Sequence, residues 1–281
     1  MDKAVLIAKF NSSKLLNEKV EILNFINDDA WARDSGAIFL LNKEKKLGGV
    51  DWEFNGWGKF SPYDSDNKIA KFMIEEAQAT YFKNDMILEG GSIHTDGEGT
   101  LLTTEQCLLN KNRNPDLAKE QIEENLKDYL GVNKIIWLKN GTDEGTDGHV
   151  DNIASFVAPG KILALSCSDK YDSFYDKINE NLEILKKSVD SKGRVLEIIE
   201  LEMSYKRLIP NDDEPSSYIN FYIANKGIVM PSFDDEKADK NAQKIIQEAF
   251  PDRKTVAING IDISMGGGNV HCITQQQPLS I

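Results

Sequence analysis

Apolar residues recur along the chain in two alternating patterns, one with a helical period and one typical of strands. Helical spacing, with matching start and stop residues, predicts helices over residues 67–82, 114–130, 174–189 and 236–250. Short runs rich in β-branched residues predict strands over residues 37–41, 134–138, 153–157, 161–165, 219–224, 227–230 and 255–258. Short turns containing glycine pair several of these strands as hairpins. The alternation predicts an α/β fold.

Five short polar segments precede the predicted strand hairpins. They are centred on Ser35-Gly36, Gly90-Gly91, Gly148-His149, Ser216-Ser217 and Gly267-Gly268. Their spacing of roughly 50–70 residues suits units repeated around an axis better than one open sheet. No low-complexity linker divides the chain, so we expect residues 1–281 to form a single domain. If each repeat is a blade, the five segments converge near the axis, where a pocket forms.

Composition narrows the class of protein. The chain is 40% hydrophobic and 28% charged, which is ordinary for a soluble globular protein. A formal charge of −13 makes nucleic acid a poor partner and is compatible with a cationic substrate. No apolar stretch is long enough to cross a bilayer, and the apolar run after Lys3 is too short for a secretory signal. We therefore expect a cytoplasmic protein without a membrane partner.

Three cysteines are present, and one of them has an unusual context. Cys272 lies in residues 266–278 (GGGNVHCITQQQP), a segment too polar for the usual role of a buried cysteine as a small hydrophobe. Its glycines permit close approach to a ligand. A nucleophilic thiol needs a base or a cation nearby, and a cationic substrate can supply that charge. Cys107 and Cys167 lie in apolar, strand-like contexts and are interpreted as structural; without a CxxC pair, a structural zinc site is not expected.

The histidines supply a candidate base. His149 and Asp151 would share one face of a strand, where the imidazole can act as general base and acid and the carboxylate can bind a cation. The alternative is a surface loop or a satisfied polar pair. His94 lies close to three turn residues and is predicted to be in a turn. His271 adjoins Cys272, so in a strand it would face the other way. Without helical HExxH spacing, metal binding is the minority interpretation.

Asp34 and Glu89 complete the candidate set. Asp34 follows Trp31, Ala32 and Arg33, and the plain alternative is a loop pair between Asp34 and Arg33. Glu89 precedes two glycines, and its alternative is a carboxylate in a turn. For each residue taken alone, the functional interpretation and its plain alternative are both plausible.

Eight blocks together carry a family resemblance. They are residues 28–36 (DDAWARDSG), 51–58 (DWEFNGWG), 89–94 (EGGSIH), 103–110 (TTEQCLLN), 113–115 (RNP), 146–152 (TDGHVDN), 217–222 (SYINFY) and 266–278. In this order, and over almost the whole chain, they resemble agmatine deiminase, a guanidine-modifying enzyme related to the bacterial peptidylarginine deiminases. The final block is very specific.

The resemblance implies a five-bladed α/β propeller of the pentein type, with the site on its axis. It implies catalytic Cys272 and His149, guanidinium-binding Asp34 and Asp151, and Glu89 in support of the catalytic group. The implied reaction converts agmatine and water to N-carbamoylputrescine and ammonia, a step of putrescine and polyamine biosynthesis. No cofactor and no metal are implied, and the family suggests a homo-oligomer.

Two departures from the family pattern stand out. The family begins with a tryptophan-rich segment that is not matched here, so the first blade is expected to be incomplete, with an unpaired edge. Gly145 occupies a position where the family usually has a carboxylate that helps to form the pocket for the substrate tail. The second departure bears on the choice of substrate more than on the chemistry.

The mechanism predicted from these residues starts with two carboxylates clamping a planar guanidinium in front of Cys272. His149 then protonates the departing ammonia and activates water, while Trp31 packs on the substrate methylenes or covers its cation. Three alternatives stay open at this point. The enzyme could act on arginine, peptidyl-arginine or another guanidine, it could transfer the amidino group to an amine, or the chain could be an inactive propeller that serves as a binding module.

Overall fold

A β–β–α–β unit is repeated along the chain. The computed structural model describes residues 22–208 and 214–280, and within them four such units follow one another, each with its own three-stranded sheet. In every unit the first two strands form an antiparallel hairpin, and the third pairs parallel to the second after a helical crossover. A parallel pair requires such a crossover.

The units are built from the following elements. The first contains β1 (Ile38–Leu41), β2 (Leu47–Glu53), α3 (Ile69–Glu76) and β3 (Thr80–Ile87). The second contains β4 (His94–Thr95), β5 (Thr100–Thr104), α5 (Lys119–Leu130) and β6 (Lys134–Leu138). The third contains β7 (Ala154–Ala158), β8 (Lys161–Ser166), α6 (Tyr175–Lys187) and β9 (Glu197–Glu202). The fourth contains β10 (Tyr222–Ala224), β11 (Gly227–Ser232), α7 (Glu236–Ala249) and β12 (Lys254–Asn259).

Short helical turns occupy the connections between these elements. They are α2 (Ala32–Ser35), η1 (Gly56–Gly58), η2 (Asp66–Lys68), η3 (Gly90–Ser92), α4 (Glu105–Leu108), η4 (Val150–Asn152) and α8 (Ile261–Ser264). Three of them, α2, η3 and η4, immediately precede the first strand of a unit. These entry turns carry the polar residues considered below.

The middle strand of a unit is buried on both faces. All five residues of β5 are buried, and so are five of the six residues of β8. The crossover helices are amphipathic: α5 buries Ile122 and Leu126, and it ends at Gly131 in the left-handed conformation, φ +66°. Each helix therefore covers its own sheet with one apolar face.

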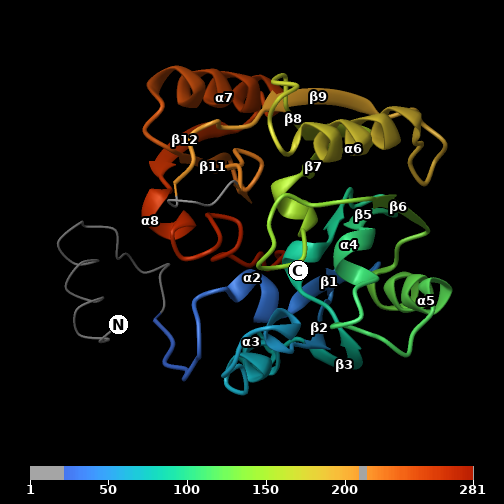
Figure 1. Ribbon diagram of the computed structural model, residues 1–281. Helices are drawn as coiled ribbons and strands as arrows, with labels where there is room; N and C mark the ends of the chain where they lie inside the picture. The colour runs from blue at the N-terminus through green and yellow to red at the C-terminus, as the bar shows by residue number, and fades with distance from the viewer. Residues whose placement is uncertain (1–21, 209–213, 281) are drawn as a thin grey trace.

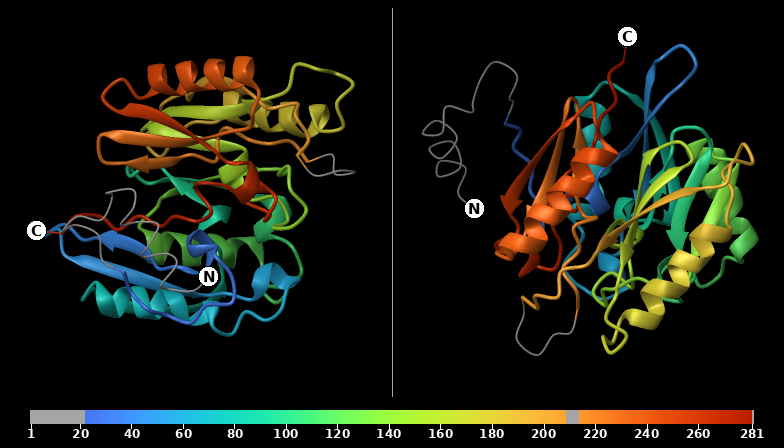
Figure 2. Two further views of the ribbon diagram at one scale, coloured as in Figure 1. Left: turned by 90° about the vertical axis from the view of Figure 1, so that its left-hand side faces the viewer. Right: turned by 90° about the horizontal axis from the view of Figure 1, so that it is seen from above.

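The four crossover helices lie at the periphery, and the chain that leads to the C-terminus runs near the middle of the molecule (Figure 1). The first two units and the last two form two halves, with the C-terminal segment passing between them (Figure 2). One large apolar cluster joins the third and fourth units, and two smaller clusters support the first two. The apolar cores thus surround a region in which polar connections meet.

Most elements predicted from the sequence are confirmed, with three differences, one of which is that the helix predicted from residue 114 begins only at Lys119. The predicted helix over residues 67–82 is wrong in its second half: α3 ends at Glu76, and Thr80–Ile87 forms β3. Gln78 adopts φ +50°, which breaks the helix, and six of the eight β3 side chains are at least partly exposed, so no apolar alternation marks the strand. The predicted strand over residues 219–224 begins only at Tyr222.

The α/β class is confirmed, whereas the five-unit ring stays a prediction. Four of the five polar entry segments lead into a unit. The fifth, around Gly267-Gly268, leads into turns without a strand in the described residues up to 280. The predicted incomplete start of the first blade falls on residues 1–21, which lie outside the described part. Among the helices of the described ranges, none combines the length and apolar character needed to span a membrane.

Candidate active site

The polar entry segments meet in one buried centre. Five predicted site residues are almost completely enclosed: Asp34 is 5% exposed, Glu89 0%, His149 1%, Asp151 3% and Cys272 7%. All of them lie in short turns between the regular elements rather than within a sheet. Such connections on a rigid scaffold commonly carry function.

Glycine shapes the turn that holds Cys272. Gly267 adopts φ +105°, a conformation that L side chains rarely take. A Cβ atom on Gly268 would lie 2.4 Å from the Trp31 ring and 3.0 Å from the Cβ atom of Cys272. The Trp31 ring therefore packs directly against the turn that carries the thiol.

The Cys272 thiol has two polar neighbours. Asn220 donates from Nδ2 to the sulfur at 3.3 Å, and the thiol donates to Oδ2 of Asp151 at 3.6 Å. Burial, together with the charges of Asp151 and Asp34, raises the pKa of Cys272 well above its ordinary value. The thiol is consequently protonated in the free protein, and a positive charge brought close to it would favour the thiolate.

His149 lies between two carboxylates. Its Nδ1 atom is 3.7 Å from Oδ1 of Asp34, and its Nε2 atom is 3.9 Å from Oε2 of Glu89. Burial lowers the pKa of His149, but Asp34, Cys107 and Glu89 outweigh this effect and raise it well above its ordinary value. The ring is therefore charged at rest and able to donate a proton.

Gly91 allows three of these groups to converge. A Cβ atom at this position would lie 2.6 Å from Nδ1 of His149, 2.7 Å from Oδ1 of Asp34 and 3.1 Å from Oδ2 of Asp151. Any side chain on residue 91 would therefore displace the histidine or the carboxylates. The close approach of these groups depends on glycine at this point.

The two clamp carboxylates are buried without a lysine or arginine ion pair among the described residues. Asp34 accepts hydrogen bonds from the Gly91 amide and from Nε1 of Trp57, both at 2.9 Å. Asp151 contacts Nδ1 of His271 at 2.8 Å, and its Oδ1 atom has no partner in the described structure. Burial raises the pKa of Asp34 to about 6 and also raises the pKa of Asp151. A bound cation would relieve this desolvation.

Glu89 has the opposite environment. Nε of Arg113 donates to Oε1 of Glu89 at 2.6 Å, and both side chains are completely buried. Arg113 also contacts the Trp57 carbonyl at 2.6 Å and Oδ2 of Asp147 at 2.9 Å. Burial opposes ionisation of Glu89, but His149 and Arg113 outweigh it and lower the pKa of this carboxyl below its ordinary value. Glu89 is therefore a fixed anion.

A cavity of about 360 Å³ opens onto this centre. Its walls are aromatic and acidic and, within residues 22–208 and 214–280, contain no lysine or arginine: Asp28, Asp29, Trp31, Asp34, Phe54, Gly56, Trp57, Phe60, Ser61, Pro62, Tyr63, Asp66, Gly145, Thr146, Gly266, Gly267 and Cys272. The cavity is not lined by His149, Glu89 or Asp151. A cation that enters the cavity therefore meets Asp34 and the thiol at the wall, with Asp151 in contact with the thiol.

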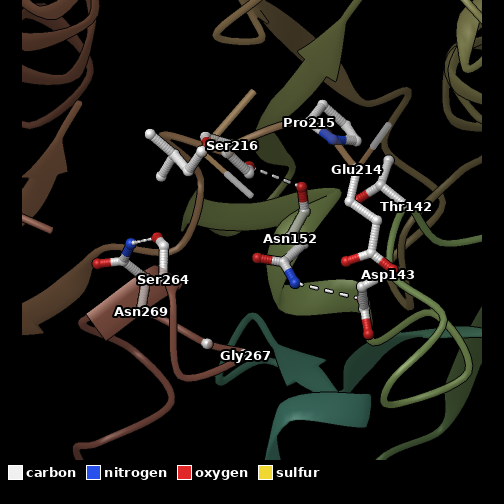
Figure 3. A pocket seen from close by; sticks show the side chains of 12 residues that line it. Thr142, Asp143, Asn152, Glu214, Pro215, Ser216, Ser264, Gly267 and Asn269 are labelled. Atoms are coloured by element: carbon white, nitrogen blue, oxygen red, sulfur yellow. Dashed lines mark hydrogen bonds between the residues drawn. The ribbon is translucent and has the colours of Figure 1, made fainter. Parts of the chain in front are cut away.

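A smaller polar cavity of about 90 Å³ shares Gly267 with the first. Figure 3 shows Asn152 pointing into it between Asp143 and Ser216, with Asn269 on the opposite side next to Ser264. Asn152 donates to Oδ2 of Asp143 at 3.3 Å. The two cavities thus lie on either side of the glycine turn that precedes Cys272.

The histidine predictions need three corrections. His149 and Asp151 do not share a strand face, because Asp151 lies in the 3-10 turn η4 and His149 immediately precedes it. His94 is not in a turn: it belongs to β4, and its Nδ1 atom accepts from the Phe156 amide at 3.2 Å. His271 does not face away from the centre, since its ring contacts Asp151. Around His149 and His271 the backbone is irregular, so strand alternation does not apply.

Cys107 also differs from its prediction. It lies in the short helix α4 rather than in a strand, and its sulfur is within 4.8 Å of ligand-type atoms of Glu89 and His149. Such a trio could hold a metal ion, but the Arg113 guanidinium bonded to Glu89 opposes a second cation there. The third cysteine, Cys167, is buried away from these groups and near Tyr205.

Sequence reasoning missed several residues that shape the centre: Gly91, Arg113, Asn220, Trp57 and His271. All five stand in the blocks quoted for the family resemblance. Their presence in those blocks was the available signal. Their roles depend on contacts with residues far away in the sequence, which no local pattern encodes.

Comparison with known proteins bears on this site. Residues 2–278 match the model of a family described as Porphyromonas-type peptidyl-arginine deiminase. The chain belongs to this family. The agmatine deiminase of Pseudomonas aeruginosa (strain UCBPP-PA14) is 43% identical over 291 residues, which cover 95% of this chain and 79% of that protein. The membership is therefore supported over almost the whole chain.

Solved structures share the fold. The agmatine deiminase of Enterococcus faecalis superposes with a TM-score of 0.89 at 38% identity, covering 95% of this chain and 80% of that one. A cysteine-to-serine variant of C. jejuni agmatine deiminase with substrate bound gives a TM-score of 0.87 at 32% identity, covering 98% of this chain and 80% of that one. The four units and their connections are thus those of an agmatine deiminase fold.

Proposed function

We propose that this chain is an agmatine deiminase, a hydrolase that converts agmatine and water to N-carbamoylputrescine and ammonia through a covalent intermediate on Cys272. One observation carries the proposal. Two buried carboxylates without a lysine or arginine ion pair, Asp34 and Asp151, accompany a protonated thiol at an acidic cavity. The relatives named agmatine deiminase support the same activity.

Binding of the guanidinium is the first step. Asp34 and Asp151 each present a carboxylate that can accept paired N–H donors from the planar cation. The positive charge stabilises both carboxylates and also favours ionisation of Cys272, whose proton has Asp151 as an acceptor at 3.6 Å. Substrate binding and nucleophile activation are therefore coupled by charge, and Trp31 covers the face of the substrate on the turn side.

Chemistry follows in two halves. The thiolate adds to the guanidinium carbon and forms a C–S bond, and His149 donates its proton to an amino group, which leaves as ammonia. The product of this half is an amidino thioether on Cys272. The now neutral His149 removes a proton from water, and the hydroxide adds to the same carbon. The C–S bond then breaks as the hydroxyl proton passes to the sulfur, which releases the carbamoyl product and the Cys272 thiol. Glu89 stabilises the charged form of His149 during this cycle.

Agmatine is favoured over arginine because of the charge of the cavity. Arginine carries an α-carboxylate, and such a group would need a basic partner at the pocket. The cavity walls contain Asp28, Asp29 and Asp66 in addition to Asp34, and no lysine or arginine from the described part of the chain. Arg33, a basic residue in the matched blocks, lines a different cavity. A substrate with a cationic tail fits these walls better.

Two alternatives are weaker on the same grounds. Another guanidine with a neutral or cationic tail would keep the chemistry and change only the contacts around Gly145. An inactive binding module is disfavoured, because the five predicted catalytic and clamp groups are all present and buried together. The expected homo-oligomer stays a prediction.

The decisive experiment measures ammonia release from agmatine, arginine and a blocked arginyl peptide. We expect turnover of agmatine, far less of the other two, and none by Cys272→Ala, with Cys167→Ala as the matched control of a second buried cysteine. The carbamoyl product should form in equal amount to ammonia, with or without an added amine, because water and not the amine is the acceptor. Turnover by a folded Cys272→Ala protein would rule out the covalent mechanism.

A further inference from the structure

We propose that Arg33 is a positioning residue: its buried guanidinium fixes the peptide that carries Cys272 and supplies the positive charge that favours the thiolate. The inference rests on the proposed function, because it assigns a role in activating the same nucleophile. It also explains why a buried arginine precedes the clamp residue Asp34 without forming a salt bridge with it in the described structure.

Five hydrogen bonds join Arg33 to the C-terminal segment, one of them from Nε2 of Gln275 to the Arg33 carbonyl at 3.4 Å. Its backbone amide donates to the Cys272 carbonyl at 3.0 Å, and its Nε atom donates to the His271 carbonyl at 3.3 Å. Its Nη1 atom donates to the side-chain oxygens of Gln275 at 2.7 Å and Gln276 at 2.6 Å. Arg33 in α2 thus binds the carbonyl groups of Cys272 and of the residue before it, although more than two hundred residues separate α2 from them in the sequence.

The acceptors of these bonds are all neutral, so the guanidinium charge is not cancelled by a direct partner. The side chain is only 3% exposed, and Nη2 has no partner among the described residues. Burial lowers the pKa of Arg33, and the charges of Asp151, Asp34 and Cys272 raise it again. Because an interaction between charges acts equally on both partners, Arg33 stabilises the ionised forms of those three groups.

Arg33 acts from the side opposite the substrate. It lines a separate cavity of about 140 Å³ together with His94, Gln275 and Gln276, and it is absent from the walls of the 360 Å³ cavity that contains Cys272. Both histidines near it, His94 and His271, have a pKa lowered by burial and are neutral, so neither supplies this charge. Arg33 therefore provides a positive charge on the side of the thiol away from the substrate cavity, and the bound substrate provides one on the cavity side.

The test separates charge from tethering with three variants. Arg33→Met removes both, Arg33→Lys keeps the charge and loses the paired geometry, and the double variant Gln275→Ala with Gln276→Ala loosens the tether while leaving the charge. For each, the rate of Cys272 alkylation by iodoacetamide is measured from pH 7 up to the pH at which the rate levels off, because the pKa of Cys272 is raised well above its ordinary value. The values of kcat and KM for agmatine are measured alongside. Circular dichroism and thermal unfolding verify the fold.

We expect Arg33→Met to move the pH midpoint of alkylation upward by about one unit, which slows alkylation about tenfold at neutral pH. Its kcat should fall by at least that factor, with a smaller change in KM. Arg33→Lys should keep the wild-type midpoint while kcat falls, and the double glutamine variant should also keep the midpoint. A wild-type midpoint in folded Arg33→Met would overturn the inference. If the Met variant does not fold, a raised midpoint in Arg33→Lys would overturn it instead.

The alkylation profile does not depend on the identity of the substrate. If the wild-type protein fails to hydrolyse agmatine, the proposed function fails, and the pH midpoints still decide the role of Arg33.

Discussion

Two groups of buried carboxylates lie side by side in this protein and differ in one respect, the presence of an arginine partner. Glu89 shares its burial with Arg113 at 2.6 Å, and the pKa of Glu89 is lowered. Asp34 and Asp151 are equally buried without such a partner, and burial raises the pKa of each. The same chemical group is therefore held as a permanent anion in one place and kept ready for a cation in the other.

The comparison indicates how the structure divides its tasks. The Glu89–Arg113 pair also holds Asp147 and the Trp57 carbonyl, so it connects segments from different units and belongs to the framework. Asp34 and Asp151 weaken the free protein, because burial disfavours their ionised forms and neither has a lysine or arginine ion pair in the described structure. A bound guanidinium supplies the positively charged partner that the fold does not give these two carboxylates. The predictions below test this difference, from the largest expected effect to the smallest.

Replacing Arg113 with Met should have the largest effect on stability. It leaves Glu89 buried without its partner, and breaking a buried ion pair costs roughly 3–5 kcal/mol of unfolding free energy. Urea denaturation measures the change. The control is Lys83→Met, whose partner Glu53 is partly exposed; there the loss should stay below about 1 kcal/mol. An equal, small loss in both variants would show that the Glu89 pair is not part of the framework.

Asp151→Asn should separate activity from stability. The amide keeps the shape of the side chain and can still bond to His271, but it removes one charge of the clamp. We expect kcat/KM for agmatine to fall by roughly 10²–10³-fold, the equivalent of losing one partner of a buried charge pair. Unfolding free energy at pH 7 should stay the same or rise. Loss of stability comparable to that of Arg113→Met would contradict the distinction between the two groups.

The pH dependence of stability should have opposite signs for the two groups. The pKa of Asp34 rises from 3.8 to about 6 on folding, so its contribution to stability is present below pH 3.8 and is lost as pH rises through 6. The pKa of Glu89 falls on folding, so its contribution is present above its ordinary value and is lost at lower pH.

The measurement compares wild type with Asp34→Asn by urea denaturation from pH 4 to pH 7. The variant should gain stability relative to wild type as pH rises through this window, and saturating agmatine should reduce the wild-type loss, because its cation pairs the carboxylate. A difference that stays flat with pH would mean that Asp34 does not titrate in this range.

Gly145→Glu should have the smallest effect. Gly145 lines the substrate cavity, and a Cβ atom there meets no heavy atom within 4 Å, so a side chain fits. A partly solvated carboxylate near the substrate's ammonium is worth about 0.2–1 kcal/mol, which lowers KM for agmatine by a factor of about 1.4 to 5. Gly145→Gln is the matched control without charge. If both variants changed KM alike, packing rather than charge would be responsible.

The sequence predicts the repeating elements and most residues of the site, for reasons that are local. Strand runs such as residues 161–165 and the helix over residues 236–250 follow from periodicity and end at recognisable turns. Cys272 is recognisable from its glycine-rich, polar surroundings. The helix over residues 67–82 fails in its second half, because β3 is largely exposed and lacks the pattern on which such a prediction depends.

Which groups face one another was decided only by the tertiary structure. His271 follows no strand alternation, because its turn directs the ring to Asp151, and Cys107 approaches His149 from a short helix in another unit. Arg113 could equally have been a surface residue, yet it is completely buried against Glu89.

Taken alone, the sequence determined the α/β repeat, the turns at which polar residues collect and the chemical types gathered there, because these depend on neighbours along the chain. Only the tertiary structure decided which carboxylate received an arginine and which remained without one. That choice depends on contacts between connections distant in sequence, where burial makes each charge sensitive to a single partner.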